Sequence, residues 1–112
     1  MKRQRHGYAA GKAASTELTK RLGIEYARDG IRANVLNIGY TSGALVSRAV
    51  HHSNADEEAV RNKRDSCVPR GKQGTPEEVA AVSAFLASDA SSFINATEIY
   101  CDGGTHSMTY GY

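Results

Sequence analysis

The feature that most constrains the fold is the long stretch of chain between two strand-like segments. Residues 31–37 and 97–101 are short, contain β-branched side chains and are followed by glycine-containing loops. The residues between them are far too many for a hairpin, and a crossover of this kind joins neighbouring parallel strands. Parallel sheets carry helices on both faces and contain more than two strands. The sequence therefore predicts an α/β fold of which these two strands form a portion.

Residues 8–28 have the periodicity of a helix. Apolar residues recur every four positions and form one stripe: Ala10, Ala14, Leu18, Leu22 and Tyr26. Gly30 stands where a left-handed residue ends a helix. Gly11 and Gly23 lie inside this range and each costs about 1 kcal/mol relative to alanine. A glycine at such a position often allows a close packing contact.

A second helix is predicted over 76–87 by a capping box. Thr75 is its N-cap, Pro76 takes the first helical position, and Glu78 completes the box. The apolar face of this helix consists of Val79, Val82, Phe85 and Leu86.

A third, weaker helix is expected over 53–66. Ser53 or Asn54 would cap it, and acidic residues in its first turn would favour the helix dipole. Its apolar content is small, so we expect it to lie on the surface.

Composition excludes several classes of protein. The 112 residues include 14 Lys and Arg and 12 Asp and Glu, a net charge of +2 that indicates no polyanionic partner such as nucleic acid. No apolar run approaches the roughly 20 residues needed to span a bilayer. The basic N-terminus is followed by no hydrophobic stretch, so no signal peptide is predicted. Two cysteines without an export signal favour reduced thiols and a cytoplasmic location. The adjacent His51 and His52 lack further ligands at recognisable spacing, and no metal site is predicted.

Tyr8 and Lys12 are the residues with the clearest chemistry. Four positions apart on a helix, they share one face and lie within reach of each other. A lysine ammonium beside a phenol stabilises the phenolate, and such a pair can donate or accept a proton at a carbonyl or alcohol oxygen. Taken alone, the spacing is a weak signal and favours a packed tyrosine and a solvated lysine, because such pairs occur by chance in many helices.

A series of motifs in register resembles the short-chain dehydrogenase/reductase family. The motifs are Tyr8-Ala9-Ala10-Gly11-Lys12, Gly30-Ile31-Arg32-Ala33-Asn34, Asn37-Ile38-Gly39-Tyr40-Thr41, Gly74-Thr75-Pro76-Glu77-Glu78 and Asp102-Gly103-Gly104. The resemblance implies that residues 1–112 form a single, incomplete NAD(P)-binding domain. This domain would be the C-terminal portion of a doubly wound parallel-sheet, Rossmann-like three-layer fold, with two strands and three to four helices.

The resemblance also implies roles for particular residues. Tyr8 would be the catalytic acid/base, and Lys12 would stabilise its phenolate and hydrogen-bond the nicotinamide ribose. Gly39 and Thr41 would lie in the loop that holds the nicotinamide, and residues 42–73 would form a variable lid over the substrate. The implied reaction transfers a hydride between NAD or NADP and a small-molecule alcohol or ketone, in a homo-oligomer when the family domain is complete.

Several positions depart from the family pattern. Ile38 replaces the usual proline, Gly43 the threonine expected near the cofactor diphosphate, and Ala96 the usual glycine, a small change in packing. The catalytic serine and the glycine-rich diphosphate turn have no counterpart before Tyr8. Gly7 and Gly11 imitate such a turn, but no strand precedes them. We therefore expect negligible activity from this polypeptide by itself.

Two alternative hypotheses remain at this stage. The first is a non-catalytic interaction module, because the helix with the Tyr-Lys pair and the C-terminal helix and strand form subunit interfaces in the family. The second is a truncated reading frame without a separate role.

Overall fold

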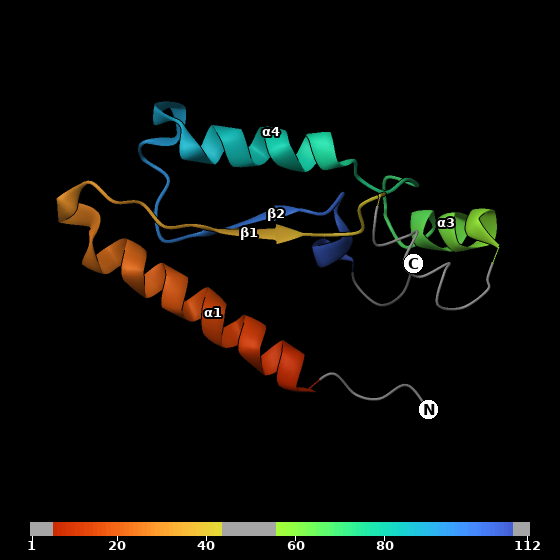
Figure 1. Ribbon diagram of the computed structural model, residues 1–112, viewed down its shortest axis with the longest axis horizontal. Helices are drawn as coiled ribbons and strands as arrows, with labels where there is room; N and C mark the ends of the chain where they lie inside the picture. The colour runs from red at the N-terminus through yellow and green to blue at the C-terminus, as the bar shows by residue number, and fades with distance from the viewer. Residues whose placement is uncertain (1–5, 44–55, 109–112) are drawn as a thin grey trace. The chain divides into compact units, whose positions relative to one another are not determined.

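The computed structural model describes residues 6–43 and 56–108, and residues 1–5, 44–55 and 109–112 lie outside the described part. The chain divides into two compact units, Met1–Val35 with Leu86–Ile99, and Leu36–Phe85 with Tyr100–Tyr112. The main elements are α1 (His6–Glu25), β1 (Val35–Ile38), α3 (Glu57–Asp65), α4 (Pro76–Ala87) and β2 (Glu98–Cys101) (Figure 1). Among the described helices, none combines the length and apolar character needed to cross a membrane.

Strands β1 and β2 are neighbours in a two-stranded parallel sheet (Figure 1). Val35 N donates to Thr97 O at 2.9 Å, and Gly39 N donates to Cys101 O at 3.1 Å. The pairing advances equally along both strands, as parallel register requires. The predicted α/β class and the predicted pairing of these two segments are confirmed.

Strand β1 begins later than the expected range of 31–37, because the pairing before Val35 mixes one backbone hydrogen bond, from Ala96 N to Ala33 O at 3.0 Å, with contacts of asparagine side chains. Asn95 Oδ1 accepts from Ala33 N at 2.9 Å. Asn34 Nδ2 donates to Ile94 O at 2.9 Å, and Asn34 Oδ1 accepts from Thr97 N at 3.3 Å. Regular pairing starts only where these asparagine contacts end. For the same reason β2 begins at Glu98, one residue after the expected start.

Arg32 joins three backbone carbonyls in the first unit. Its Nη2 donates to Leu86 O and to Ser88 O, both at 3.0 Å, and its Nη1 donates to Ile94 O at 3.2 Å. Carbonyls at a helix C-terminus have no partner within the helix. Arg32 thus supplies donors at the end of α4 and to the loop that leads into β2.

Helix α1 ends earlier than the expected residue 28. The helix is α-helical over His6–Glu25 and continues, after Tyr26, as a 3₁₀ turn at Ala27–Asp29. Gly30 then adopts a left-handed conformation with φ of 77°, as the sequence predicts for the terminating residue. Ile31 N donates back to Tyr26 O at 3.3 Å and completes the reversal.

Helices α3 and α4 have different kinds of cap. Helix α4 spans Pro76–Ala87, and its capping box is formed by Thr75 N to Glu78 Oε2 at 2.8 Å and Glu78 N to Thr75 Oγ1 at 3.2 Å. Helix α3 is capped by Asp56, which accepts from Glu58 N. The expected caps of α3, Ser53 and Asn54, lie outside the described residues.

Ala96 has a conformational consequence that its sequence position did not reveal. Its φ is +53°, which makes it the one non-glycine residue with positive φ in the described chain. The expectation of a small packing change was therefore wrong, because the cost arises from the backbone. An L-residue in this region brings Cβ close to the following carbonyl oxygen.

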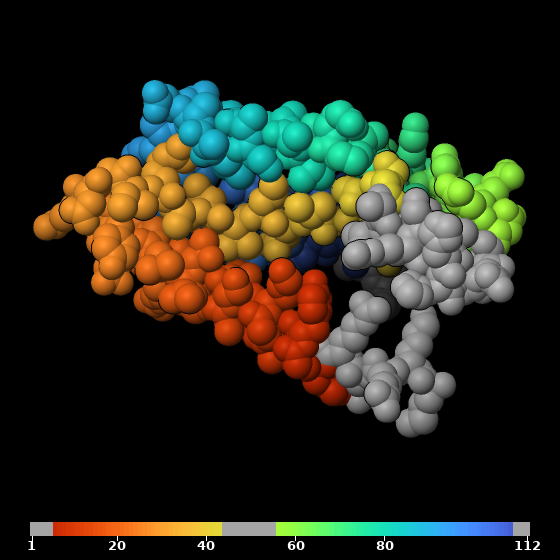
Figure 2. Space-filling model, viewed as in Figure 1, coloured from red at the N-terminus to blue at the C-terminus, as the bar shows by residue number. Residues whose placement is uncertain are grey.

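Few apolar side chains are fully buried in the part of the chain that the structure describes. Val68 is the one core hydrophobic residue, with 4% of its surface exposed. Helix α1 (red to orange) lies at the surface along its length in Figure 2, with Leu18 60% and Ile24 62% exposed. The described chain therefore presents unusually extensive apolar surface.

Candidate active site

Tyr8 and Lys12 lie one turn apart near the start of α1, in the first unit. Lys12 Nζ is 5.8 Å from the centroid of the Tyr8 ring. The phenol is 66% exposed, and Lys12 is also exposed. Both polar ends therefore have access to a ligand.

Gly39 lies immediately after β1, in the second unit, and is required by a close backbone contact. A Cβ at this position would lie 2.6 Å from both Cα and Cβ of Asp102. Asp102 follows β2 and forms a turn in which its carboxylate accepts from Gly104 N and His106 N. Gly39 therefore contributes a tight approach between the two strand ends.

Thr41 is held in an extended conformation by Gly74. Ser42 N donates to Gly74 O, and Gly74 N donates to Tyr40 O, both at 2.9 Å. In such a parallel bridge the central residue directs its own amide and carbonyl to the opposite side. The carbonyl of Thr41 accepts from Arg64 Nη2 at 3.1 Å.

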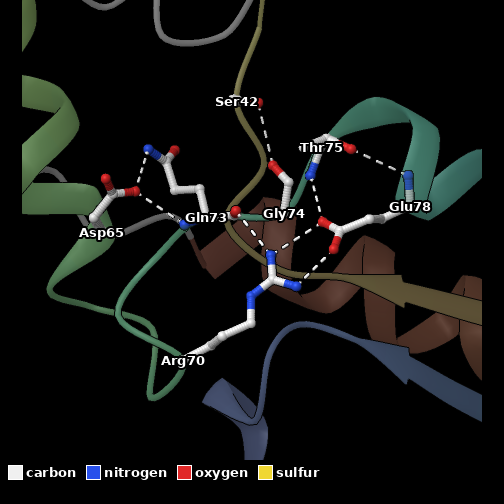
Figure 3. Close-up of polar contacts among 7 residues, drawn as sticks. All are labelled: Ser42, Asp65, Arg70, Gln73, Gly74, Thr75 and Glu78. Atoms are coloured by element: carbon white, nitrogen blue, oxygen red, sulfur yellow. Dashed lines mark hydrogen bonds and ion pairs between the residues drawn. The ribbon is translucent and has the colours of Figure 1, made fainter.

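Gln73 is the buried centre of the contacts around this loop, with 3% of its surface exposed. Its Oε1 accepts from Arg64 Nε at 2.6 Å. Its Nε2 and backbone N both donate to Asp65 Oδ1, at 3.0 and 2.9 Å (Figure 3). Hydrogen bonds from the Gln73 backbone and side chain lower the pKa of Asp65 below its ordinary value. The amide and the carboxylate are thus fixed in one arrangement.

Arg70 connects the same segment to α4. Its Nη1 and Nη2 donate to the two carboxylate oxygens of Glu78 at 2.6 and 3.0 Å, and Nη2 also donates to Gln73 O at 3.0 Å (Figure 3). The Arg70 side chain, with the amide of Thr75, lowers the pKa of Glu78 to about 2. This bidentate pair is a directional contact as well as an electrostatic one.

Sequence reasoning missed Arg64, Gln73 and Arg70 as residues that shape the loop. Their contacts join positions 8, 9 and 23 residues apart, across turns and irregular segments. No helical or strand periodicity relates such positions. The capping box, by contrast, places its partners three residues apart and is legible locally.

The second unit contains two cavities near this loop. One of about 240 Å³, beside Thr41 and Arg70, is smaller than the roughly 300–1,000 Å³ of typical ligand pockets. The other, of about 410 Å³, is lined by polar and charged groups that include Glu57, Arg61 and Lys72, and no aromatic or large apolar side chain lines it. The first cavity is therefore small for a ligand pocket, and the second lacks the apolar and aromatic side chains that usually line one.

Metal ligands are not gathered in the described chain. Over residues 6–43 and 56–108 no group of three His, Cys, Asp or Glu side chains is placed to hold an ion. His51 and His52 lie outside this range.

The donor set can be tested against a nicotinamide cofactor. A phenol, an ammonium and an outward-facing backbone amide, from Tyr8, Lys12 and Thr41, are donors suited to ribose hydroxyls and a carboxamide oxygen. Gly43, where the family has a threonine, has φ of +110°, a conformation that a β-branched residue rarely adopts. Taken unit by unit, the donor types present are therefore compatible with the nicotinamide end of the cofactor, and the backbone at Gly43 differs from what a threonine would adopt.

Comparisons with known proteins show which family this chain resembles. Residues 1–106 match the profile of a family described as enoyl-(acyl carrier protein) reductase. The chain is 37% identical over 107 residues to the uncharacterized oxidoreductase YxbG of Bacillus subtilis, covering 95% of this chain and 39% of that protein. It is 42% identical over 97 residues to 3beta-hydroxysteroid dehydrogenase 1 of Eggerthella lenta, covering 87% of this chain and 35% of that one.

Solved structures show the same relationship. Ligand-free aldohexose dehydrogenase of Thermoplasma acidophilum matches the whole chain with a TM-score of 0.88 and 29% identity, over 45% of its own length. An oxidoreductase of the short-chain dehydrogenase/reductase family from Burkholderia thailandensis matches 91% of the chain with a TM-score of 0.80 and 32% identity, over 39% of its length. The chain belongs to the short-chain dehydrogenase/reductase family. It spans less than half the length of each of these relatives.

Proposed function

We propose that this chain carries the proton-transfer pair of an oxidoreductase that moves a hydride between NAD or NADP and an alcohol or ketone. The observation that carries the proposal is the Tyr8–Lys12 pair, exposed on one face of α1 with Nζ 5.8 Å from the ring centroid. Membership of the family supports the cofactor class. The names of two similar proteins, a hydroxysteroid dehydrogenase and an aldohexose dehydrogenase, support the substrate class.

Each residue would act on a stated atom. Tyr8 Oη would donate a proton to the carbonyl oxygen of a ketone and accept one from the hydroxyl of an alcohol. Lys12 Nζ would stabilise the phenolate between these events and hold the nicotinamide ribose. Thr41 N would donate to the carboxamide oxygen. When bound, the nicotinamide supplies or receives the hydride, and the protein orients it and moves the proton.

The first test measures turnover of the 112-residue polypeptide. NADH and NADPH absorbance is followed with a panel of ketones, and NAD and NADP with alcohols. We expect negligible turnover, because no glycine-rich diphosphate turn and no catalytic serine accompany Tyr8 in this sequence. Turnover that disappears in Tyr8→Phe would contradict the expected inactivity and support the role of Tyr8.

The second test places the pair in a full-length protein of the family. Residues 6–108 of this chain replace the matching segment of the Thermoplasma aldohexose dehydrogenase, and the chimaera is assayed with an aldohexose. Tyr8→Phe is expected to lower kcat by about 10²–10⁴-fold. Tyr26→Phe, which removes a phenol hydroxyl from just beyond the other end of α1, is the matched control and should leave kcat unchanged. Equal activity of the two variants would sink the proposed role of Tyr8.

A second candidate function is association through α1 without catalysis. The exposure of large apolar side chains on this helix, among them Leu18 and Ile24, favours it, because exposed apolar surface is available for association. Light scattering during size-exclusion chromatography should then give a mass above that of the monomer, reduced in Leu18→Ser with Ile24→Ser. Glu25→Gln, a polar change on the same helix, is the control, and a clean monomer would count against association.

A further inference from the structure

A single side chain of α3, Arg64, reaches the loop that contains Thr41. Its Nη2 donates to Thr41 O at 3.1 Å, its Nε donates to Gln73 Oε1 at 2.6 Å, and its guanidinium carbon lies 5.0 Å from the centroid of the Tyr40 ring. The planar guanidinium thus uses two donors and one face at the same time, which a lysine cannot reproduce.

The buried side chain of Gln73 and its partner Asp65 fix the orientation of Arg64. Gln73 is 3% exposed and is itself held by two donations to Asp65, the residue next to Arg64 on α3. Because Gln73 Oε1 is held in one position, the guanidinium that donates to it is also held beside Thr41 O.

The contact with Thr41 also determines which backbone group of the loop is left to bind a ligand. The amide and carbonyl of Thr41 both face away from Gly74, and Arg64 takes the carbonyl. A carboxamide approaching this residue would therefore meet the Thr41 amide as its hydrogen-bonding group. Arg61, on the same helix, instead pairs with Glu57 at 3.4 Å.

We infer that Arg64 is a positioning residue that locks residues 40–42 to α3 and leaves the Thr41 amide for the nicotinamide carboxamide. Through this residue the segment expected to form the lid and the loop expected to hold the nicotinamide are joined. The carboxamide part of the inference rests on the proposed function, whereas the coupling of α3 to the loop stands on the contacts above.

Amide hydrogen exchange on the full 112-residue chain tests the coupling. The reporters are Ser42 N and Gly74 N, whose hydrogen bonds hold the loop. In Arg64→Met we expect their exchange to accelerate by about tenfold or more, because a charged hydrogen bond is lost, with α4 unchanged. Arg64→Lys should restore part of the protection, and Asp65→Asn should cause a smaller change at the same amides.

The matched control is Arg61→Met, which removes an arginine from the same helix and should leave both reporters at wild-type rates. Arg64→Met with Ser42 and Gly74 exchanging within twofold of wild type would overturn the inference. Equally fast exchange of Ser42 and Gly74 in Arg61→Met would also overturn it, because the effect would then come from any loss of arginine on α3.

Added NADH separates this inference from the proposed function. In the wild type NADH should slow exchange at Thr41 and along α3, and in Arg64→Met it should bind about tenfold more weakly and leave α3 unprotected. Protection of α3 that persists in Arg64→Met would contradict the coupling. If wild type binds no NADH at millimolar concentration, the chimaera decides the proposed cofactor role, and the exchange rates without ligand still decide the role of Arg64.

Discussion

Ala96 holds a left-handed backbone conformation that glycine adopts without strain. Its φ of +53° places Cβ near the next carbonyl oxygen, and Asn95 Oδ1 accepts from the Ala96 amide at 2.9 Å, which fixes the residue there. This geometry accounts physically for the glycine that the family usually has at this position.

We therefore predict that Ala96→Gly stabilises the chain by about 0.5–1 kcal/mol, the relief of strain less the added freedom of the unfolded glycine. Urea unfolding followed by circular dichroism measures the change. Ala84→Gly, an exposed alanine inside α4, is the control and should destabilise by about 1 kcal/mol. A loss of stability in both variants would show that position 96 carries no strain.

Glu78 gives a prediction about pH. Arg70 and the Thr75 amide lower its folded pKa from 4.5 to about 2, so the ionised carboxylate stabilises the folded state. This stabilisation is complete above about pH 4.5 and is lost as the pH falls through about 2. Glu78→Gln should therefore unfold at a lower urea concentration than wild type at pH 7, with a difference that shrinks steadily between pH 4.5 and 2.

Glu77→Gln is the control for Glu78, because it removes a charge from the same helical turn and leaves the Arg70 pair intact. A constant difference between Glu78→Gln and wild type from pH 7 to pH 2 would contradict the assigned linkage.

At the scale of elements, α1 contains two glycines with opposite surroundings. A Cβ at Gly23 would lie 2.8 Å from Ala33 O and from Asn95 Oδ1, whereas Gly11 has nothing within 4 Å. The close packing expected of a helical glycine is thus present at Gly23 and absent at Gly11.

We predict opposite effects of the same substitution. Gly23→Ala should destabilise the chain by about 1–3 kcal/mol, because the methyl group displaces Asn95 and the hydrogen bond from its Nδ2 to Gly23 O. Gly11→Ala should stabilise by up to about 1 kcal/mol through helix propensity. Thermal unfolding of both variants checks this, and changes of equal sign would contradict the packing at Gly23.

The two kinds of element differ in how far the sequence predicts them. The capping box before α4 and the left-handed Gly30 act through neighbours in sequence, and both are found as expected. The start of β1 could not be foreseen, because it depends on Asn95 reaching Ala33 from a distant segment. The contacts of Arg64 at the loop escaped prediction for the same reason, since no local pattern relates residues 41, 64 and 73.

At the scale of the whole molecule, the described residues bury few of their apolar side chains. Val68 is the one fully buried hydrophobic side chain among them, whereas the family members that the chain matches are more than twice its length. A longer chain buries a larger fraction of its surface on folding. A chain of 112 residues is therefore expected to bury a smaller fraction of its surface than these longer relatives do.

We predict a broad urea transition with an m value of about 1 kcal/mol/M or less, since m follows the surface exposed on unfolding. Strong fluorescence of a hydrophobic dye in the absence of denaturant should accompany it. The Leu18→Ser, Ile24→Ser variant should reduce the dye signal, and Glu25→Gln should not. A steep transition without dye binding would show that the apolar surface is covered.

The three backbone carbonyls that accept hydrogen bonds from Arg32 limit which amino acids position 32 can tolerate. One planar group serves the end of a helix, the turn after it and the approach to a strand, so no other side chain can replace all three contacts together. In a library that carries all twenty amino acids at position 32, almost no substitution should therefore give a folded protein, and lysine should fail as well. Arg28, exposed in the nearby 3₁₀ turn, should accept most. The positive charge is the same at both positions, and only its geometry makes one of them irreplaceable.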